Sequence, residues 1–147
     1  MATKTKFTTA VMAVLMLLGS AASTPAHHSF SVVFDREKCM DLHGTLTSVD
    51  WENPHAWLRV DIPDANGQVV EWRLEMITPN ALARNGSPRS AFTANFGKPI
   101  QTRSCLAREG AGEHLAAAEY IRMADGLIRI VGQVVEDIGP EQLSFWE

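Results

Sequence analysis

The sequence predicts a mainly β fold, a small five-stranded OB-like barrel with one short helix between its third and fourth strands. Three observations predict it. Several runs alternate apolar and polar residues with a period of two, the phase of the first run shifts in its middle, and a helix signal separates the third run from the fourth. A core that contains two or more long helices would contradict this fold.

The first alternating run contains the shift in phase. Leu42 and Leu46 fall on one face of an extended strand, whereas Val49 and Trp51 continue the apolar pattern one residue out of step. A shift of this kind indicates a β-bulge, because one extra residue exchanges the two faces of a strand. The sequence therefore predicts a bent first strand that starts at about Asp41.

Two more alternating runs follow and are joined by a turn. Residues 56–62 and 69–76 both place apolar side chains at the even-numbered positions. Between them, residues 63–67 read Pro-Asp-Ala-Asn-Gly, a composition typical of tight turns. The first three strands are therefore predicted to form a meander.

A helix signal interrupts the strands after this meander. Thr78 is a typical N-cap and Pro79 suits the first turn of a helix, whereas Asn85 and Gly86 are typical of a helix end. This pattern predicts one short helix. We expect irregular or briefly helical structure over residues 87–96.

Two further strands are predicted after the helix. The fourth extends over about residues 98–107 and the fifth over about 116–123, with a glycine-rich loop at 110–112 between them. Asp125-Gly126 is a turn signal that leads into residues 127–131. Three strands, a helix and two strands is the order of elements in an OB-like barrel.

The N-terminal segment, residues 1–26, is predicted to be a signal peptide. Lys4 and Lys6 form its basic end, residues 10–18 are continuously apolar, and the residues after them are mostly small. The apolar stretch is too short to span a bilayer. We expect a protein that is exported to a bacterial periplasm, or secreted, and that has no membrane span.

Two cleavage sites satisfy the rule that small residues precede the cut, one after Ala22 and one after Ala26. Cleavage at the second site would make His27 the new N-terminus. About 120 residues would then remain, which is the size of one domain. We place this domain at residues 27–132, followed by a C-terminal tail at 133–147.

The charge of the mature chain argues against a nucleic-acid partner. The full chain has 13 Lys and Arg against 17 Asp and Glu, and the leader takes two lysines with it. The mature chain therefore has 11 against 17, a net charge of −6. An acidic surface of this kind repels phosphate backbones.

The two cysteines, Cys39 and Cys105, are predicted to form a disulfide, because paired thiols of exported proteins usually do. A bridge across a loop of this length stabilises a fold by about 4 kcal/mol in the chain-entropy model. The alternative is that they supply two thiolate ligands for a soft metal. That would require Cys-x-x-Cys spacing or nearby histidines at ligand spacing, which neither cysteine has.

The adjacent histidines near the predicted cleavage site indicate a metal centre. If cleavage follows Ala26, His27 offers both its α-amino group and its imidazole, which can chelate one ion, and His28 stands beside it. His55 is the candidate for a third nitrogen, since Asn53-Pro54 restricts the chain just before it. Three nitrogen ligands favour copper, so copper is the expected metal. In the alternative interpretation, His27 and His28 belong to a solvated linker and His55 has a structural role.

Trp57 and Trp51 are candidates for a ligand-binding surface at the mouth of the barrel. Both lie on or beside predicted strands, so packing in the core is the alternative. Together with Phe145 and Trp146 of the tail, they form the basis of a second functional hypothesis. In this hypothesis the protein is a periplasmic accessory module that binds a non-metal ligand or a protein partner.

Catalytic signatures are missing from the chain. It contains no G-x-S-x-G, no H-E-x-x-H, no phosphate-binding glycine loop before a helix and no Cys-x-x-Cys. Its carboxylates are not paired by spacing. The sequence therefore favours a binding protein over an enzyme.

Several strings, taken in order, resemble a family of small exported bacterial proteins known only as a domain of unknown function. The likeness extends over about residues 27–132, and it implies export and a single small domain but no activity. The chain departs from the family pattern at Ser87, where the family usually has Trp, and in its cysteine pair. The strings are His27-His28-Ser29-Phe30, Phe34-Asp35, residues 44–51, Asn53-Pro54-His55-Ala56, residues 72–75, residues 79–86 and Ala124-Asp125-Gly126.

Overall fold

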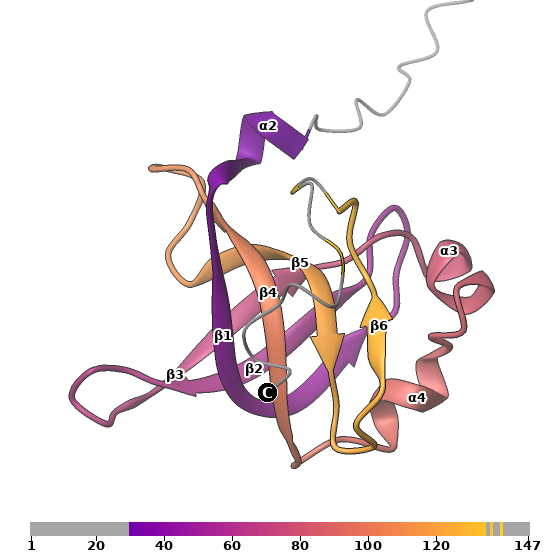
Figure 1. Cartoon of the computed structure of the whole chain (residues 1–147). Helices are drawn as coiled ribbons and strands as arrows, with labels where there is room; N and C mark the ends of the chain where they lie inside the picture. The colour runs from indigo at the N-terminus through magenta and orange to yellow at the C-terminus, as the bar shows by residue number, and fades with distance from the viewer. Residues whose placement is uncertain (1–29, 135, 137–138, 140–147) are drawn as a thin grey trace, which may run out of the picture.

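The computed structural model describes residues 30–134, 136 and 139, so the predicted signal peptide, His27, His28 and most of the tail lie outside the described residues. Figure 1 shows the arrangement of the elements. In chain order they are α2 (Phe30–Val33), β1 (Phe34–Asp50), β2 (Trp57–Pro63), β3 (Val69–Glu75), α3 (Pro79–Arg84), α4 (Arg89–Thr93), β4 (Pro99–Ala107), β5 (Leu115–Arg122) and β6 (Ile128–Ile130).

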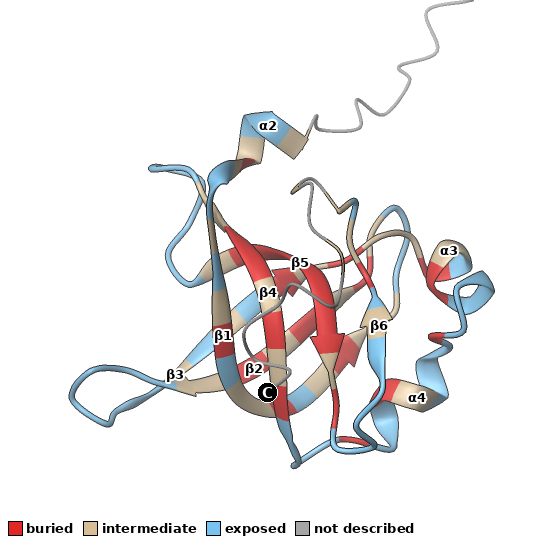
Figure 2. Cartoon of the chain, viewed as in Figure 1, coloured by how far each residue is buried: buried red, intermediate tan, exposed pale blue. Residues whose placement is uncertain are grey.

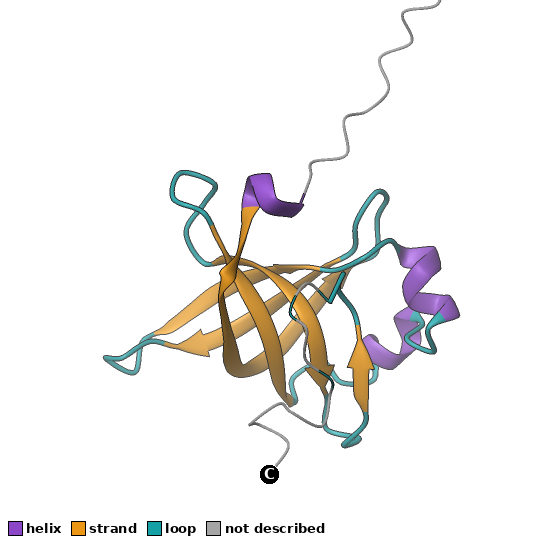
Figure 3. Cartoon of the chain, turned by 45° about the horizontal axis from the view of Figure 1, so that its top comes forward, coloured by secondary structure: helices purple, strands orange, loops and turns teal. Residues whose placement is uncertain are grey.

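The strands form a closed barrel. Neighbouring strands pair in the order β3-β2-β1-β4-β5-β6, and β3 also pairs with β5, in parallel, which closes a ring of five strands. The two short helices between β3 and β4 lie on the side of the barrel away from the β2–β3 hairpin (Figure 3). The predicted OB-like barrel is confirmed, with the helices α2 and α4 and the short outer strand β6 as additions.

The bend in β1 occurs where the sequence predicts it. The register between β1 and β2 shifts between Leu46 and Ser48, as a bulge requires. Up to Thr45 the strand pairs with β4, and from Thr45 onward it pairs with β2. One strand can therefore serve two neighbours because the bulge redirects it.

The first strand begins at Phe34, earlier than the predicted start at about Asp41. Residues 35–40 are mostly exposed and polar, so they show no alternation that would reveal a strand. The strand is instead anchored to β4 on either side of residues 35–38, with Phe34 opposite Ala107 and Cys39 opposite Cys105, and the register shifts between these two pairs. A strand that is specified by its partner rather than by an apolar face leaves little trace in the sequence.

The core fills the barrel and extends under the helices, as the red segments of Figure 2 show. Helix α3 contributes Leu82 and α4 contributes Phe92, and both side chains are fully buried. The ring of Phe92 lies 5.9 Å from that of Trp51. The barrel strands supply the remaining large core side chains, which include Leu46, Leu58, Val60, Leu74 and Ile121.

Helix α3 has the ends that the sequence predicts. The Thr78 hydroxyl accepts a hydrogen bond from the amide of Ala81 at 3.2 Å, which makes Thr78 the N-cap. After the helix, Asn85 donates its amide to the Ala81 carbonyl, and Gly86 adopts a φ of 80°. Glycine is favoured there because residues with a β-carbon rarely enter the left-handed region.

The turn between β5 and β6 is also as predicted. The carboxylate of Asp125 accepts hydrogen bonds from the amide of Leu127 and from the guanidinium of Arg129. The bond from Arg129 is the main cause that lowers the pKa of Asp125, and the Leu127 amide acts in the same direction. The charged carboxylate thus stabilises the turn that directs β6 back along β5.

Gly44 of β1 has no room for a β-carbon against β2, and we expect Gly44→Ala to lower the free energy of unfolding by about 1–3 kcal/mol. A β-carbon there would stand 2.5 Å from the Asp61 carbonyl oxygen and 2.8 Å from a side-chain carbon of Ile62. Urea unfolding measures the effect, with the exposed Lys38→Ala on the same strand as control. Adding Ile62→Ala, which removes the contacting side-chain carbon, should not restore stability, since the closest contact is with the Asp61 backbone. Full recovery in that double variant would contradict this explanation.

Candidate functional site

His55 lies in the loop between β1 and β2 and is paired with a carboxylate. Its Nδ1 contacts Oε1 of Glu75, the last residue of β3, and the two side chains are 21% and 18% exposed. The loop is fixed against the end of β3, because the Met76 amide donates to the Ala56 carbonyl at 2.8 Å and the Ala56 amide donates to Ile77. His55 is therefore held in one place with one of its ring nitrogens engaged.

This arrangement is the one in which histidines commonly bind metals. A carboxylate that engages one ring nitrogen fixes the orientation of the imidazole and increases the basicity of the other nitrogen. In His55 the nitrogen left for coordination is Nε2. His55 is one of the ligands predicted from the sequence, whereas its partner Glu75 is not.

The start of the described chain lies beside this pair. Glu75 of the His55–Glu75 pair lines a shallow pocket together with Phe30 and Met76. The buried carboxylate Glu119, which is 1% exposed, lines the same pocket. Phe30 opens helix α2, which leads directly into β1 (Figure 1). Phe30, the first described residue, therefore lies near Glu75.

The two other predicted metal ligands are close to this point in the chain. His28 precedes Phe30 by two residues and His27 by three. At most about 3.6 Å is gained per extended residue, so their α-carbons lie within about 11 Å of that of Phe30. Of the three predicted ligands, His55 is the one within the described residues.

A second site is a cavity of about 740 Å³ at the other side of the barrel. His43, Gln101 and Arg122 stand in one row across three neighbouring strands, because His43 pairs with Gln101 and Gln101 with Arg122. The Gln101 side-chain nitrogen lies 3.4 Å from Nδ1 of His43. Apolar residues complete the wall, among them Pro63, Val69, Pro99, Ile100 and Met123.

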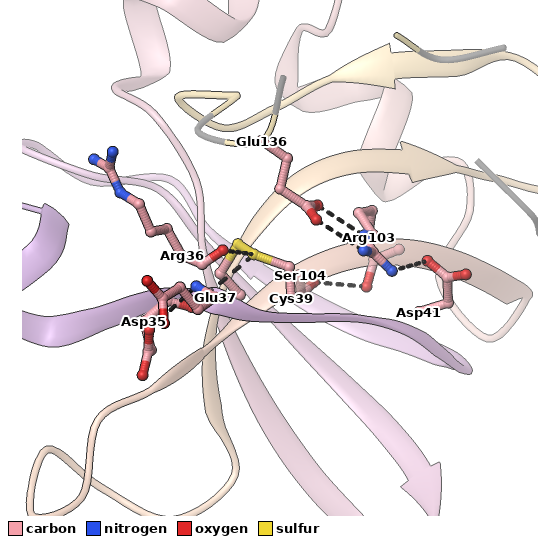
Figure 4. The surroundings of a disulfide bond; sticks show 10 residues. Asp35, Arg36, Glu37, Cys39, Asp41, Arg103, Ser104 and Glu136 are labelled. Carbon is pink, nitrogen blue, oxygen red and sulfur yellow. Dashed lines mark hydrogen bonds and ion pairs between the residues drawn. A yellow bond between two sulfur atoms is a disulfide. The ribbon is translucent and has the colours of Figure 1, made fainter. Parts of the chain in front are cut away.

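The predicted proximity of the two cysteines is confirmed. Cys39 and Cys105 face each other across the β1–β4 ladder, with α-carbons 3.8 Å apart, and form a disulfide (Figure 4). The Glu136 carboxylate lies within 4.8 Å of both sulfurs. While the sulfurs are joined, neither is a thiolate, so this group is not a metal site in the oxidised protein.

Arg103 binds the chain that follows β6 to the outer face of the sheet. Its guanidinium donates to both carboxylate oxygens of Glu136, at 2.7 and 2.8 Å, and to Asp41 at 3.2 Å (Figure 4). The hydrogen bond with Glu136 is the main cause that raises the pKa of Arg103. Because the two hydrogen bonds to Glu136 are bidentate, they fix the orientation of its carboxylate in addition to the attraction between the charges.

The two tryptophans of the predicted ligand surface make contacts within the fold. The guanidinium of Arg73 lies 4.7 Å from the ring centre of Trp57, a cation–π contact. Trp51 is half-buried and packs against Phe92 of helix α4. Neither side chain lines the cavity of about 740 Å³. No helix within residues 30–134 combines the length and apolar composition that a membrane span needs.

Comparison with known proteins identifies the family. The model of a family of unknown function, DUF6152, matches residues 14–117, which is more than half of the chain and extends from the predicted leader into β5. No curated protein and no solved structure was found to match. The predicted resemblance to a family of unknown function is confirmed, and the chain belongs to DUF6152.

Proposed function

We propose that this protein is exported to the periplasm and binds one copper ion there through His27, His28 and His55. The observation that carries the proposal is the pair of His55 with Glu75, whose carboxylate lines a pocket together with Phe30, two residues after His28 in the sequence. The pair orients one imidazole, and the neighbouring segment can bring the other nitrogens to it.

The expected donor set fits copper. An N-terminal His27 supplies an α-amine and an imidazole, and Nε2 of His55 supplies a third nitrogen. Copper stands highest among the divalent metals of its row in affinity for such ligands. His28 is the alternative imidazole on the same segment. Cleavage after Ala26 is part of the proposal, since only then is the amine of His27 free.

Two features support export. The leader has the three regions of a signal peptide. The Cys39–Cys105 disulfide is also typical of oxidising compartments such as the periplasm. The structure of the leader itself lies outside the described residues.

Copper titration tests the proposal. The chain that begins at His27, prepared without a histidine tag, should bind one Cu(II). The same chain with one added residue before His27 should bind at least about tenfold more weakly, because its amine becomes an amide. His55→Ala should lose affinity too, and Glu75→Gln should lose about 10–100-fold, as removal of a carboxylate behind a ligand does.

The matched control is His43→Ala, which removes an exposed histidine on the other side of the barrel and should leave affinity unchanged. Equal copper affinity in the His27-initiated, extended and His55→Ala proteins would refute the site. The second candidate function, an accessory module that binds a non-metal ligand or a periplasmic protein, would then be preferred. The cavity of about 740 Å³ is the observation that favours it.

A further inference from the structure

The cavity of about 740 Å³ combines an apolar wall with polar side chains along one edge. All five barrel strands form it, β1 with residues 43–45 from its middle and the other four with their ends, together with the turn after β5. Its edge holds the row of His43, Gln101 and Arg122, and Asp61 stands on the β2 side. A wall of this kind suits a segment with apolar side chains and neighbouring carboxylates.

The C-terminal segment is bound next to this row. Glu136 is held by Arg103, which faces Asp41 across the β1–β4 ladder. On β4, Gln101 lies two positions before Arg103, and on β1, His43 lies two positions after Asp41. Residues two apart on a strand share a face and are separated by about 7 Å. The bound Glu136 and the cavity edge therefore lie on the same face of the sheet, in neighbouring rows.

The remaining chain has the length and composition to fill the cavity. Residues 140–147 read Pro-Glu-Gln-Leu-Ser-Phe-Trp-Glu, and eight residues can extend over as much as about 29 Å. Leu143, Phe145 and Trp146 are apolar, and Glu141 and Glu147 are acidic. Such a concentration of apolar side chains is normally covered in a water-soluble fold.

We propose that residues 140–147 dock into this cavity, with Phe145 and Trp146 against its apolar wall and an acidic side chain toward Arg122. The occupant is thus a segment of the same chain, which a separate ligand of the cavity would have to displace. The proposal goes beyond copper binding and does not depend on it, because the cavity shares no residue with the histidine site.

Nuclear magnetic resonance on the isotopically labelled protein tests this docking. Three chains are compared: the full chain, a chain that ends at Gly139, and the full-length Phe145→Ala/Trp146→Ala variant. The Arg103–Glu136 contact is retained in all three. Amide signals of residues 43–45, 100–101 and 122–126 should shift in both altered chains, whereas those of residues 85–87 and 89–90 beside the helices should not.

The matched control is Ser144→Ala, which lies between the apolar side chains and should shift the cavity amides far less than the double substitution. A synthetic peptide of residues 140–147, added to the chain that ends at Gly139, should reverse the shifts. Unchanged cavity signals in the double variant would overturn the proposal. Shifts that depend on protein concentration would also overturn it, because the tail would then dock in a second copy.

Discussion

Removal of the Cys39–Cys105 disulfide should lower the free energy of unfolding by about 4 kcal/mol. The two cysteines are 66 residues apart in the sequence, so the bond excludes many extended conformations of the unfolded chain. It also joins β1 to β4, a pair of strands that has no short connection. The test is urea unfolding of the Cys39→Ala/Cys105→Ala variant, in which both thiols are absent.

Two comparisons make this result specific. The wild-type protein unfolded in the presence of a dithiol reductant should lose about as much stability as the double variant. The double variant itself should not respond to reductant. If wild type and double variant unfold at the same urea concentration, the bond contributes nothing to stability and the loop-entropy argument fails.

Phe92→Ala should destabilise the protein by about 3–5 kcal/mol, since it empties a large, fully buried site. Phe92 is the buried residue of helix α4 and lies against Trp51. Its loss would therefore detach the helix from the barrel as well as leave a cavity. Urea unfolding measures the effect, and the near-ultraviolet circular dichroism of the folded variant should change because the ring next to Trp51 is lost.

The chain offers a matched control four residues further on. Phe96 is 40% exposed, so Phe96→Ala removes the same ring from a site that water already reaches. It should cost less than about 1 kcal/mol. Equal losses from the two substitutions would show that α4 does not depend on its buried face.

The barrel could be predicted because the residues of its inner face alternate with outward-facing residues along the sequence. Leu58, Val60 and Leu74 alternate with polar neighbours, and each is buried. Thr78 gave the start of α3 because its side chain is a cap of known geometry. The early start of β1 could not be predicted, since its exposed residues show no alternation and its pairing with β4 at Phe34 and Cys39 depends on a distant strand.

The His55–Glu75 pair could have been found from the sequence. The turn at residues 63–67 sets the register of the β2–β3 hairpin, and that register places Trp57 opposite Glu75. His55, two residues before Trp57, then falls beside the end of β3. The alternating pattern alone predicts the strands, and pairing residues outward from the turn also predicts that His55 lies near Glu75.

The polar row of the cavity, His43, Gln101 and Arg122, could not be predicted by pairing residues outward from a turn. His43 and Gln101 are 58 residues apart and belong to strands that no tight turn connects. Their register depends on the whole closed barrel. The contact between Arg103 and Glu136 is of the same kind, because nothing in the sequence near either residue identifies the other.

The position of β4 in the ring also determines the order in which the chain can fold. The β2–β3 hairpin forms from neighbouring residues, but Gly44 can pair with Ile100 only after the 55 residues between them have been synthesised. Topologies with such distant pairings fold in milliseconds to seconds, more slowly than those with local contacts. During that interval the apolar inner face of the first three strands is exposed to solvent. The nascent chain is therefore most prone to aggregation before β4 pairs with β1.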